Sequence, residues 1–278
     1  MNTGQHHYDQ LVFSGGGTRC FWQGGFLDVV RGKLALDPTR IAGVSGGALT
    51  GVGFIAHCGP RVLETMKSAF AAQDSNIPWN EPDDTDGLTL HQRVYRDVIE
   101  EVVTTNVASD VANGPAYQIL LGHPPSDSTF SATAATLAYE AELHLINAPH
   151  FNWAEKIGVT STLVDANAAA RDGRLADLVC AAATIPPIFD MPLWDGKPVI
   201  DGGMADQAPM PDPDRGRTLV LLTRHYRNVP DHPDLHYIAP ENETPADKID
   251  FTDPDKIQKT WDCGVVDGRQ FLQEHQIN

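Results

Sequence analysis

The stretch Arg40-Ile41-Ala42-Gly43-Val44-Ser45-Gly46-Gly47 decides the fold of this chain. It joins an apolar run, residues 41–44, to a longer run of small and apolar residues, 46–58. The first run is typical of a buried strand and the second of a helix. Gly-x-Ser-x-Gly at such a junction lifts the serine hydroxyl clear of the backbone, because the flanking glycines remove side chains that would collide there. We therefore predict that Ser45 is a nucleophile on a sharp strand-to-helix turn.

A second unit of the same kind lies upstream. Residues 9–13 indicate a short buried strand, which ends at Ser14-Gly15-Gly16-Gly17-Thr18-Arg19. Residues 19–33 then carry apolar side chains at helical spacing. Two strand–glycine turn–helix units in series predict an α/β fold on a parallel sheet.

The rest of the chain carries weaker signals. Helical patterns cover residues 60–72, 90–103 and 131–146, and β-rich runs cover 156–164 and 218–224. A hairpin turn is predicted at Asp195-Gly196, between the runs 191–194 and 198–200. Polar, proline-containing segments predict surface loops at 76–87 and 229–254, and a final helix is expected within 247–278.

The length favours one domain. With 278 residues and 30.2 kDa, the chain is able to bury roughly three quarters of its unfolded surface in one core. We expect a single domain over residues 1–278, with the motifs in 11–209 and the segment 210–278 completing the fold.

Charge and cysteine content narrow the class of function. The formal net charge of −17 gives no electrostatic reason to bind nucleic acid, and anionic lipid surfaces would repel it. Contact with a membrane would be transient and apolar. Cys20, Cys58, Cys180 and Cys263 are scattered and indicate reduced thiols, not a disulfide framework or a zinc site. Because no signal-peptide or membrane-spanning stretch is evident, we expect a cytoplasmic protein.

The glycines at positions 15–17 are candidates for the oxyanion hole of a serine hydrolase. A serine nucleophile needs donors aimed at the oxygen that becomes negative during attack on an acyl carbon. Free of side chains, the amides of Gly15, Gly16 and Gly17 are able to turn toward that oxygen. A tight turn or a phosphate cradle is the alternative interpretation, but no P-loop motif is present.

The base that activates Ser45 has two candidates. A Ser–His–acid triad in the order Ser45, Asp201, His225 or His236 fits the chain order of α/β-hydrolases. Those enzymes place several strands before the elbow, whereas only one precedes it here. The alternative is Asp201 alone, in Asp201-Gly202-Gly203 at the end of the hairpin's second strand, because partial burial raises the basicity of a carboxylate.

Several blocks of the chain resemble the patatin-like phospholipases. Residues 11–19, including Gly15-Gly16-Gly17, look like that family's oxyanion block, and 43–47 look like its elbow. A small-residue helix leading to Pro186 and Phe189, and Asp201-Gly202-Gly203 followed by Pro209, are similar to two further blocks. These motifs appear in the family's order over about residues 11–209.

The resemblance implies a three-layer α/β/α fold with a mainly parallel central sheet and a lipid acyl hydrolase without metal or cofactor. Ser45 would be the nucleophile and Asp201 the general base, without histidine. Gly15, Gly16 and Gly17 would form the oxyanion hole, and Arg19 would support that loop or meet a phosphate. The implied substrates are phospholipids, lysophospholipids or other fatty-acyl esters.

Three departures from the family pattern stand near these motifs. Cys20 replaces a glycine, Gln207 an asparagine and Ala182 a serine. Each leaves the shape of the substrate pocket open. The aromatic and apolar residues in 21–22, 185–189 and 193–194 are candidates to line an acyl groove, but ordinary core packing is the interpretation that we favour, because aromatic residues are usually buried. A small-molecule esterase and an activator-dependent lipid-binding module remain alternative functions.

Overall fold

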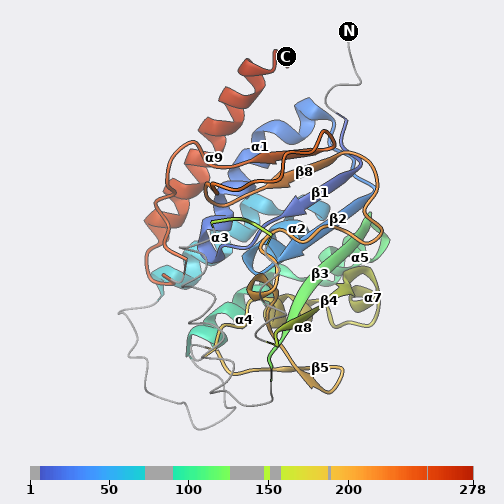
Figure 1. The fold of residues 1–278 in the computed structure, drawn as a ribbon. Coiled ribbons are helices and arrows are strands. Elements are labelled where there is room, and N and C mark those ends of the chain that lie inside the picture. The colour runs from blue at the N-terminus through green and yellow to red at the C-terminus, as the bar shows by residue number, and fades with distance from the viewer. Residues whose placement is uncertain are drawn as a thin grey trace.

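A mixed, mainly parallel β-sheet forms the centre of the molecule, and helices flank it (Figure 1). The computed structural model of the protein describes residues 7–72, 90–125, 147–150, 158–186, 189–248 and 250–277. In spatial order the main strands are β4 (Thr160–Asp165), β3 (Ala116–His123), β2 (Arg40–Val44), β1 (Gln10–Phe13), β8 (Thr218–Leu221) and β9 (Leu235–Ile238). The predicted α/β class is confirmed.

Strand β1 lies at the middle of the parallel part. Phe13 at its end pairs with Gly43 of β2 on one side and with Leu221 of β8 on the other. Strands β3 and β9 continue this parallel arrangement, whereas β4 and the short β7 (Ile200–Asp201) run antiparallel to β3. The two glycine-containing turns that follow β1 and β2 therefore leave the same edge of the sheet, where ligands of open α/β sheets bind.

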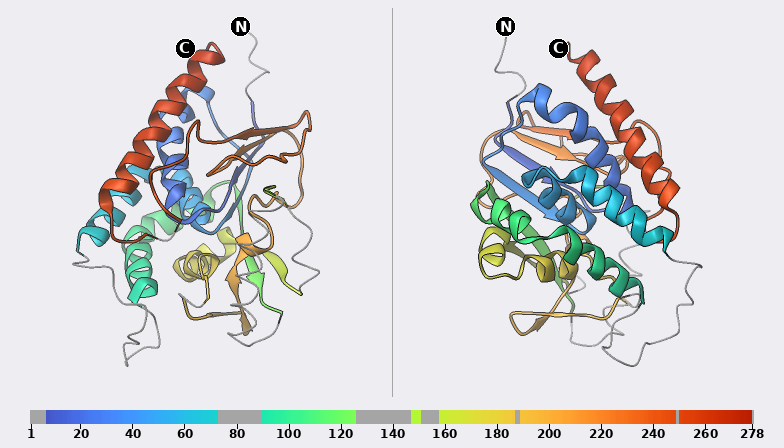
Figure 2. Two further views of the ribbon diagram at one scale, coloured as in Figure 1. Left: turned by 60° about the vertical axis from the view of Figure 1, so that its left-hand side comes forward. Right: turned by 180° about the vertical axis from the view of Figure 1, so that it is seen from behind.

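Helices cover mainly one face of the sheet, the face that is turned toward the viewer in the right-hand panel of Figure 2. In chain order they are α1 (Phe21–Leu34), α2 (Gly46–Ile55), α3 (Gly59–Ala71), α4 (Leu90–Val102), α5 (Thr105–Asn113), α7 (Ala166–Arg171), α8 (Leu175–Ala182) and α9 (Pro254–Glu274). Two 3₁₀ turns, η1 (Gly17–Cys20) and η3 (Gly202–Met204), and a small hairpin, β5 (Leu193–Trp194) with β6 (Lys197–Pro198), complete the described elements.

The C-terminal helix α9 packs along α1, and the two lie side by side in both views of Figure 2. Gly264 of α9 lies against the Trp22 carbonyl, where a β-carbon would collide with backbone. Asp253 caps the start of α9 by accepting hydrogen bonds from the amides of Asp255 and Lys256 at 3.0 and 3.1 Å. Close backbone approach thus fixes the final helix on the first one.

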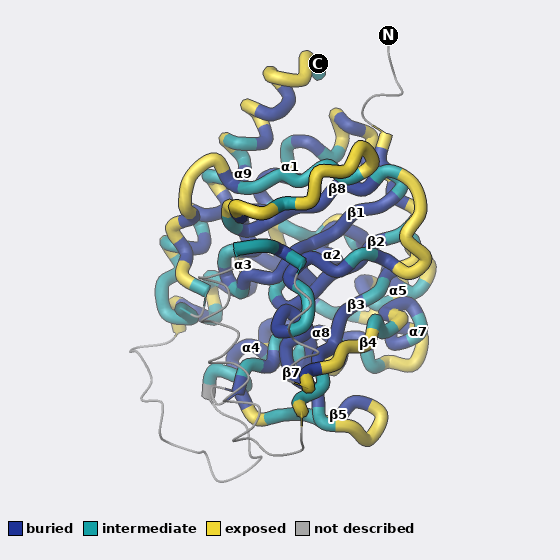
Figure 3. Tube along the Cα trace, viewed as in Figure 1, coloured by how far each residue is buried: buried dark blue, intermediate teal, exposed yellow. Residues whose placement is uncertain are grey.

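The buried residues form two clusters, one on each face of the sheet. The large core lies on the helix-covered face and includes Leu11 and Phe13 of β1, whereas Val12 faces a smaller cluster with Val220 and Tyr226. This alternation is what a strand buried on both faces requires. Figure 3 shows the central strands buried and the outer loops exposed.

Most predicted elements are present, with two notable differences. Strand β3 was not predicted, because residues 116–123 lack strict alternation and follow a polar helix. Strand β9 lies within the predicted surface loop 229–254, where pairing with β8 supplies the order that the sequence pattern does not indicate. The predicted helix at 131–146, the loop at 76–87 and residues 156–157 lie outside the described residues.

Candidate active site

Ser45 occupies the sharp turn between β2 and α2, as predicted. It caps α2 with φ 55° and ψ −136°, a conformation that costs a non-glycine residue about 1–3 kcal/mol. Behind it, a β-carbon on Gly47 would lie 2.6 Å from the Phe13 carbonyl oxygen. The turn therefore presents the Ser45 side chain while α2 packs directly on the end of β1.

The side chain of Asp201 meets Ser45 directly. Ser45 Oγ donates a hydrogen bond to Asp201 Oδ2 at 2.6 Å, and Asp201 Oδ1 accepts one from the Gly203 amide at 2.7 Å. Both side chains are buried, with exposed fractions of 3% for Ser45 and 4% for Asp201. A buried carboxylate held by a backbone donor is oriented to receive the serine proton.

Strand β3 brings these two residues together. Leu120 pairs with Val44 of β2, and the next residue, Leu121, pairs with Asp201 of β7. Strand β4 pairs with one side of β3. Strand β7 therefore pairs with the same side of β3 as β2, just beyond the end of β2. Asp201 therefore lies on β7 of the main sheet, and the hairpin's second strand, β6, ends earlier at Pro198.

The glycine loop after β1 lies beside the elbow. The Gly15 amide donates to the Gln207 carbonyl at 2.9 Å, and the Gly15 carbonyl accepts from Thr223 Oγ1 at 2.7 Å. Within the described residues, the amides of Gly16 and Gly17 donate to no protein acceptor. Of the three predicted oxyanion donors, Gly15 is thus already engaged in holding the loop.

One further donor was not predicted. The Gly46 amide opens α2 directly after Ser45 and has no protein acceptor among the described residues. The general rule that an oxyanion hole includes the amide following the nucleophile would have indicated it. Its position at a helix N-terminus also favours a developing negative charge.

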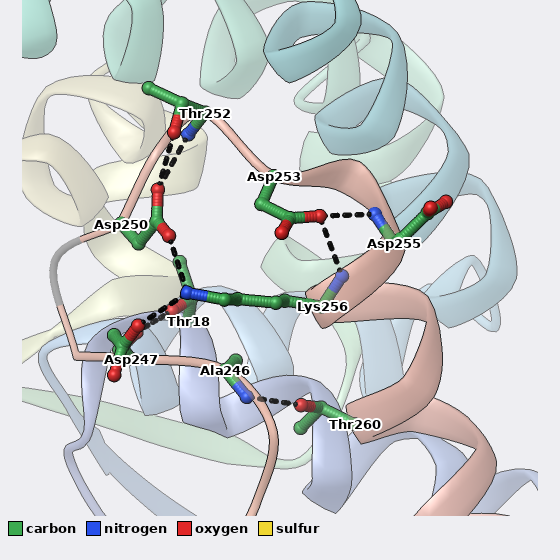
Figure 4. Close-up of polar contacts among 9 residues, drawn as sticks. All are labelled: Thr18, Ala246, Asp247, Asp250, Thr252, Asp253, Asp255, Lys256 and Thr260. Carbon is green, nitrogen blue, oxygen red and sulfur yellow. Dashed lines mark hydrogen bonds and ion pairs between the residues drawn. The ribbon is translucent and has the colours of Figure 1, made fainter. Parts of the chain in front are cut away.

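A C-terminal segment holds the glycine loop from outside, and Figure 4 shows its contacts. Thr18 donates its hydroxyl to the Asp247 carbonyl and its amide to the Lys248 carbonyl. Lys256 of α9 in turn binds Asp247 Oδ2 at 2.7 Å and Asp250 Oδ2 at 2.9 Å. We call residues 246–250, as far as they are described, the strap.

Arg19 lies half-buried in η1, next to these glycines. Its Nε is buried and has no hydrogen-bond partner within the described part of the chain. The positive charge of the Arg19 guanidinium lies near Tyr226. The Arg224 guanidinium lies over the Tyr226 ring, 4.6 Å from the ring centroid.

The two histidines of the alternative triad make contacts away from Ser45. His236 Nδ1 lies 2.5 Å from the Tyr8 hydroxyl, and His225 is exposed, with Nε2 3.4 Å from the Glu241 carbonyl. His57, which follows α2, is also exposed and lies 2.9 Å from Arg31 Nη2. The direct hydrogen bond between Ser45 and Asp201 leaves no histidine between them.

A cavity of about 270 Å³ extends from Ser45 along α2. Its walls come from α1, α2 and α3 and are mainly apolar, and Trp261 of α9 closes one side. At the far end Arg31 lies over the Phe54 ring, 4.0 Å from its centroid. The cavity lining includes Gly46 and Phe54, which lie near the two ends of the 10-residue helix α2, a helix about 15 Å long.

The predicted acyl-groove residues divide between this cavity and the core. Phe21, Ile185 and Phe189 line the cavity. Trp22 is fully buried and stacks on Phe26, so it belongs to the core. Residues 187–188 lie outside the described residues. The hairpin residues 193–194 do not line the cavity either, since Leu193 is 67% exposed and Trp194 lies under the Arg174 guanidinium.

A metal site is not formed by the residues that the structure describes. No three histidine, cysteine, aspartate or glutamate side chains converge there as a metal ion would require. The four cysteines are free thiols. Burial raises the pKa of Cys20, and the nearby Asp201 charge adds to that effect. The Cys20 thiol beside Ser45 therefore stays protonated and does not compete as a nucleophile.

The profile of the Patatin family, described as patatin-like phospholipase, matches residues 11–213. The chain belongs to this family. Family membership implies hydrolysis of lipid acyl esters, with a serine as the nucleophile. The matched span contains both turns, the Ser45–Asp201 pair and strand β3, so the geometry described above lies within the family region.

A similar fold is found in the crystal structure of VipD from Legionella pneumophila. The TM-score is 0.51 at 10% sequence identity, and the match covers 97% of this chain and 67% of VipD. At this identity the likeness concerns the fold alone. No curated protein matches the sequence. Among the described residues, no helix is long and apolar enough to cross a membrane.

Two departures from the usual patatin pattern have structural roles. Cys20 Sγ contacts the Ser14 carbonyl at 3.6 Å and lies 3.0 Å from where a β-carbon on Gly46 would be. The side-chain Nε2 of Gln207 donates to the Gly203 carbonyl at 2.8 Å, and the backbone carbonyl of Gln207 accepts from the Gly15 amide. Cys20 thus fills the contact between the two turns of this patatin-like chain, and Gln207 joins the aspartate block to the glycine loop.

Proposed function

We propose that the protein is a phospholipase A or lysophospholipase that cleaves fatty-acyl esters through a Ser45–Asp201 dyad. The observation that carries this proposal is the 2.6 Å hydrogen bond from Ser45 Oγ to Asp201 Oδ2 at one end of an apolar cavity. A serine hydroxyl is a weak nucleophile until a base takes its proton, and Asp201 is the group placed to do so.

In the first half-reaction, Asp201 accepts the Ser45 proton as Oγ attacks the ester carbonyl carbon. The tetrahedral intermediate then collapses, the alcohol leaves with the proton from Asp201, and the acyl group stays on Ser45. In the second half-reaction, Asp201 takes a proton from water, which attacks the acyl-enzyme and releases the fatty acid. Ser45 regains its proton from Asp201, so no group is consumed.

The negative charge on the carbonyl oxygen needs fixed donors. We assign this role to the amides of Gly16, Gly17 and Gly46, which have no protein acceptor within the described residues. Gly15 contributes by fixing the loop through Gln207 and Thr223. Loss of one oxyanion donor typically costs about 3–4 kcal/mol of transition-state stabilisation.

The shape of the cavity favours a fatty-acyl substrate over an acetyl or butyryl ester. An extended chain of single bonds advances roughly 1.2 Å per bond, so the length of α2 accommodates about twelve carbons. Arg31 and Phe54 line the far end, and Leu49 and Met66 lie between the two ends as apolar walls. Burial of each methylene contributes about 0.8 kcal/mol to binding, which makes chain length a strong determinant.

Arg19 is our candidate for binding a lipid phosphate, because its buried Nε lacks a protein partner among the described residues. The net charge of −17 weakens attachment to anionic membranes, so we expect transient contact with lipid surfaces and none with nucleic acid. We also propose a cytoplasmic location, which four free thiols support.

The first test combines a serine-directed fluorophosphonate with p-nitrophenyl esters of two to sixteen carbons. We expect labelling and turnover in the wild type, loss of both in Ser45→Ala, and an optimum at about twelve carbons. Phosphatidylcholine and lysophosphatidylcholine then show whether phospholipids are substrates. An acetyl or butyryl optimum would support a small-molecule esterase, and lipid binding without labelling or turnover would support an activator-dependent module.

A further inference from the structure

Tyr95 of α4 lines the cavity that contains Ser45, and its hydroxyl is buried. Its side chain is only 6% exposed, and its ring packs near Phe189 and Phe251, with centroid distances of 6.3 and 6.4 Å. Both of these phenylalanines also line the cavity. Tyr95 therefore forms part of an aromatic wall and brings one polar atom into it.

The Tyr95 hydroxyl is the exception among the hydroxyl and thiol groups of the described cavity wall. Ser45 donates to Asp201, Thr18 to the Asp247 carbonyl, Cys20 to the Ser14 carbonyl and Thr50 to the Gly46 carbonyl. Tyr95 Oη alone is buried without a hydrogen-bond partner among the residues described. A buried tyrosine hydroxyl normally finds a partner, because leaving it unpaired destabilises the folded state.

Tyr95 and Ser45 line the same cavity. The Asp201 carboxylate is among the groups that add to the effect of burial on the pKa of the Tyr95 hydroxyl. Burial raises its pKa well above the usual range, so the group is a protonated hydrogen-bond donor at neutral pH. When a fatty-acyl ester fills the cavity and excludes water, the acceptor for this donor has to come from the substrate.

We propose that the Tyr95 hydroxyl donates a hydrogen bond to the alkoxy oxygen of the scissile ester. The proposal rests on the proposed ester hydrolysis. The amides of Gly16, Gly17 and Gly46 are assigned to the carbonyl oxygen, which leaves the alkoxy oxygen as the second acceptor at the reacting centre. That oxygen gains negative charge as the C–O bond breaks, and a donor held in an apolar wall stabilises it. No proton moves from Tyr95.

The test compares Tyr95→Phe with the wild type on an oxygen ester and a thioester of the same acyl chain. Sulfur is a weak acceptor, so the thioester lacks the proposed contact. We expect kcat/KM for the ester to fall about 3–10-fold in Tyr95→Phe, and kcat/KM for the thioester to change by less than about twofold. An equal loss on both substrates, or no loss on either, would overturn the proposal.

Thermal unfolding supplies a readout that a structural role would move in the opposite direction. Tyr95→Phe removes an unpaired polar atom, so its Tm should equal or exceed that of the wild type. Tyr117→Phe is the matched variant, because the buried Tyr117 hydroxyl donates to the Ala48 carbonyl at 2.6 Å, and its Tm should fall. A fall in Tm for Tyr95→Phe would contradict the assignment.

The proposal and the proposed function fail in distinguishable ways. If wild-type protein hydrolyses neither substrate and its Ser45 is not labelled, ester hydrolysis itself is wrong. If the wild type is active and Tyr95→Phe retains its full ester activity, only the role of Tyr95 is wrong.

Discussion

The two turns that leave the same edge of the sheet are built in different ways. The turn after β2 is a single sharp step at Ser45, and its position follows from β2, α2 and the neighbouring strand β3. The turn after β1 runs through Gly15 and Gly16 into η1 and is held by Gln207, Thr223 and the strap. Ser45 is thus placed by the sheet, whereas the glycine loop after β1 is placed by segments distant in the sequence.

This contrast suggests a division of labour. Changes near β2, β3 and β7 should affect activation of Ser45, and so the labelling by fluorophosphonate. Changes in the strap or near the glycine loop should affect stabilisation of the transition state while the Ser45–Asp201 hydrogen bond persists. Four substitutions, taken from the largest expected effect to the smallest, test whether the two turns act separately.

Asp201→Asn removes the base of the elbow. We expect kcat to fall about 10²–10⁴-fold, because an amide cannot accept the Ser45 proton. Ester turnover and the rate of fluorophosphonate labelling should fall together. His225→Ala is the control, since His225 is exposed and lies away from the pair. Full activity in Asp201→Asn with loss in His225→Ala would instead show that a histidine, and not Asp201, takes the Ser45 proton.

Gly17→Ala disturbs the glycine loop that follows β1. Gly17 has φ 58°, and a β-carbon there would collide with the Lys248 carbonyl. We expect displacement of the loop and a fall in kcat of about 10²–10³-fold, the size seen on losing one oxyanion donor. Gly173→Ala is matched in backbone strain, with φ 71°, but has open space around it, so it should lower Tm and leave kcat unchanged.

Lys256→Met releases the strap from α9. The two carboxylates of Asp247 and Asp250 raise the pKa of Lys256 through their hydrogen bonds, so the lysine is fully charged at neutral pH. Exposed ion pairs contribute little individually, and we expect kcat to fall only about twofold. In wild-type protein, a similar loss should appear as salt is raised. Lys259→Met, on the exposed side of α9, should change neither quantity.

Ser45→Gly, compared with Ser45→Ala, isolates the strain of the elbow. Both variants lose the hydroxyl and should be inactive, but only glycine adopts φ 55° without cost. Chemical denaturation should show Ser45→Gly more stable than Ser45→Ala by about 1 kcal/mol. Equal stability of the two variants would show that the turn is not strained at Ser45.

The chemistry of the site could be predicted from sequence because it depends on local rules. Glycines around Ser45 are required wherever a strand turns sharply into a helix, and that requirement is visible in five consecutive residues. Asp201 could be proposed for a similar reason, since the turn after it needs glycine: a β-carbon on Gly202 would collide with the backbone of β3. Short-range constraints of this kind leave a mark in the sequence.

The contacts that position these residues are long-range and leave no such mark. Nothing in residues 116–123 indicates that β3 would pair with β2 at Leu120 and with β7 at Leu121, yet this register brings Ser45 and Asp201 together. The engagement of Gly15 by Gln207 and the unpaired hydroxyl of Tyr95 likewise depend on segments far apart in the chain.

The sequence by itself determined the α/β class, the family, the two glycine-containing turns and the identity of the Ser45–Asp201 pair. Only the tertiary structure decided which amides of these turns and which hydroxyl of the cavity wall lack a partner among the described residues, and how far the apolar cavity extends. The physical reason is that backbone strain and close packing in a turn restrict residue type locally. Pairing register and hydrogen-bond satisfaction, by contrast, are settled only when distant segments meet.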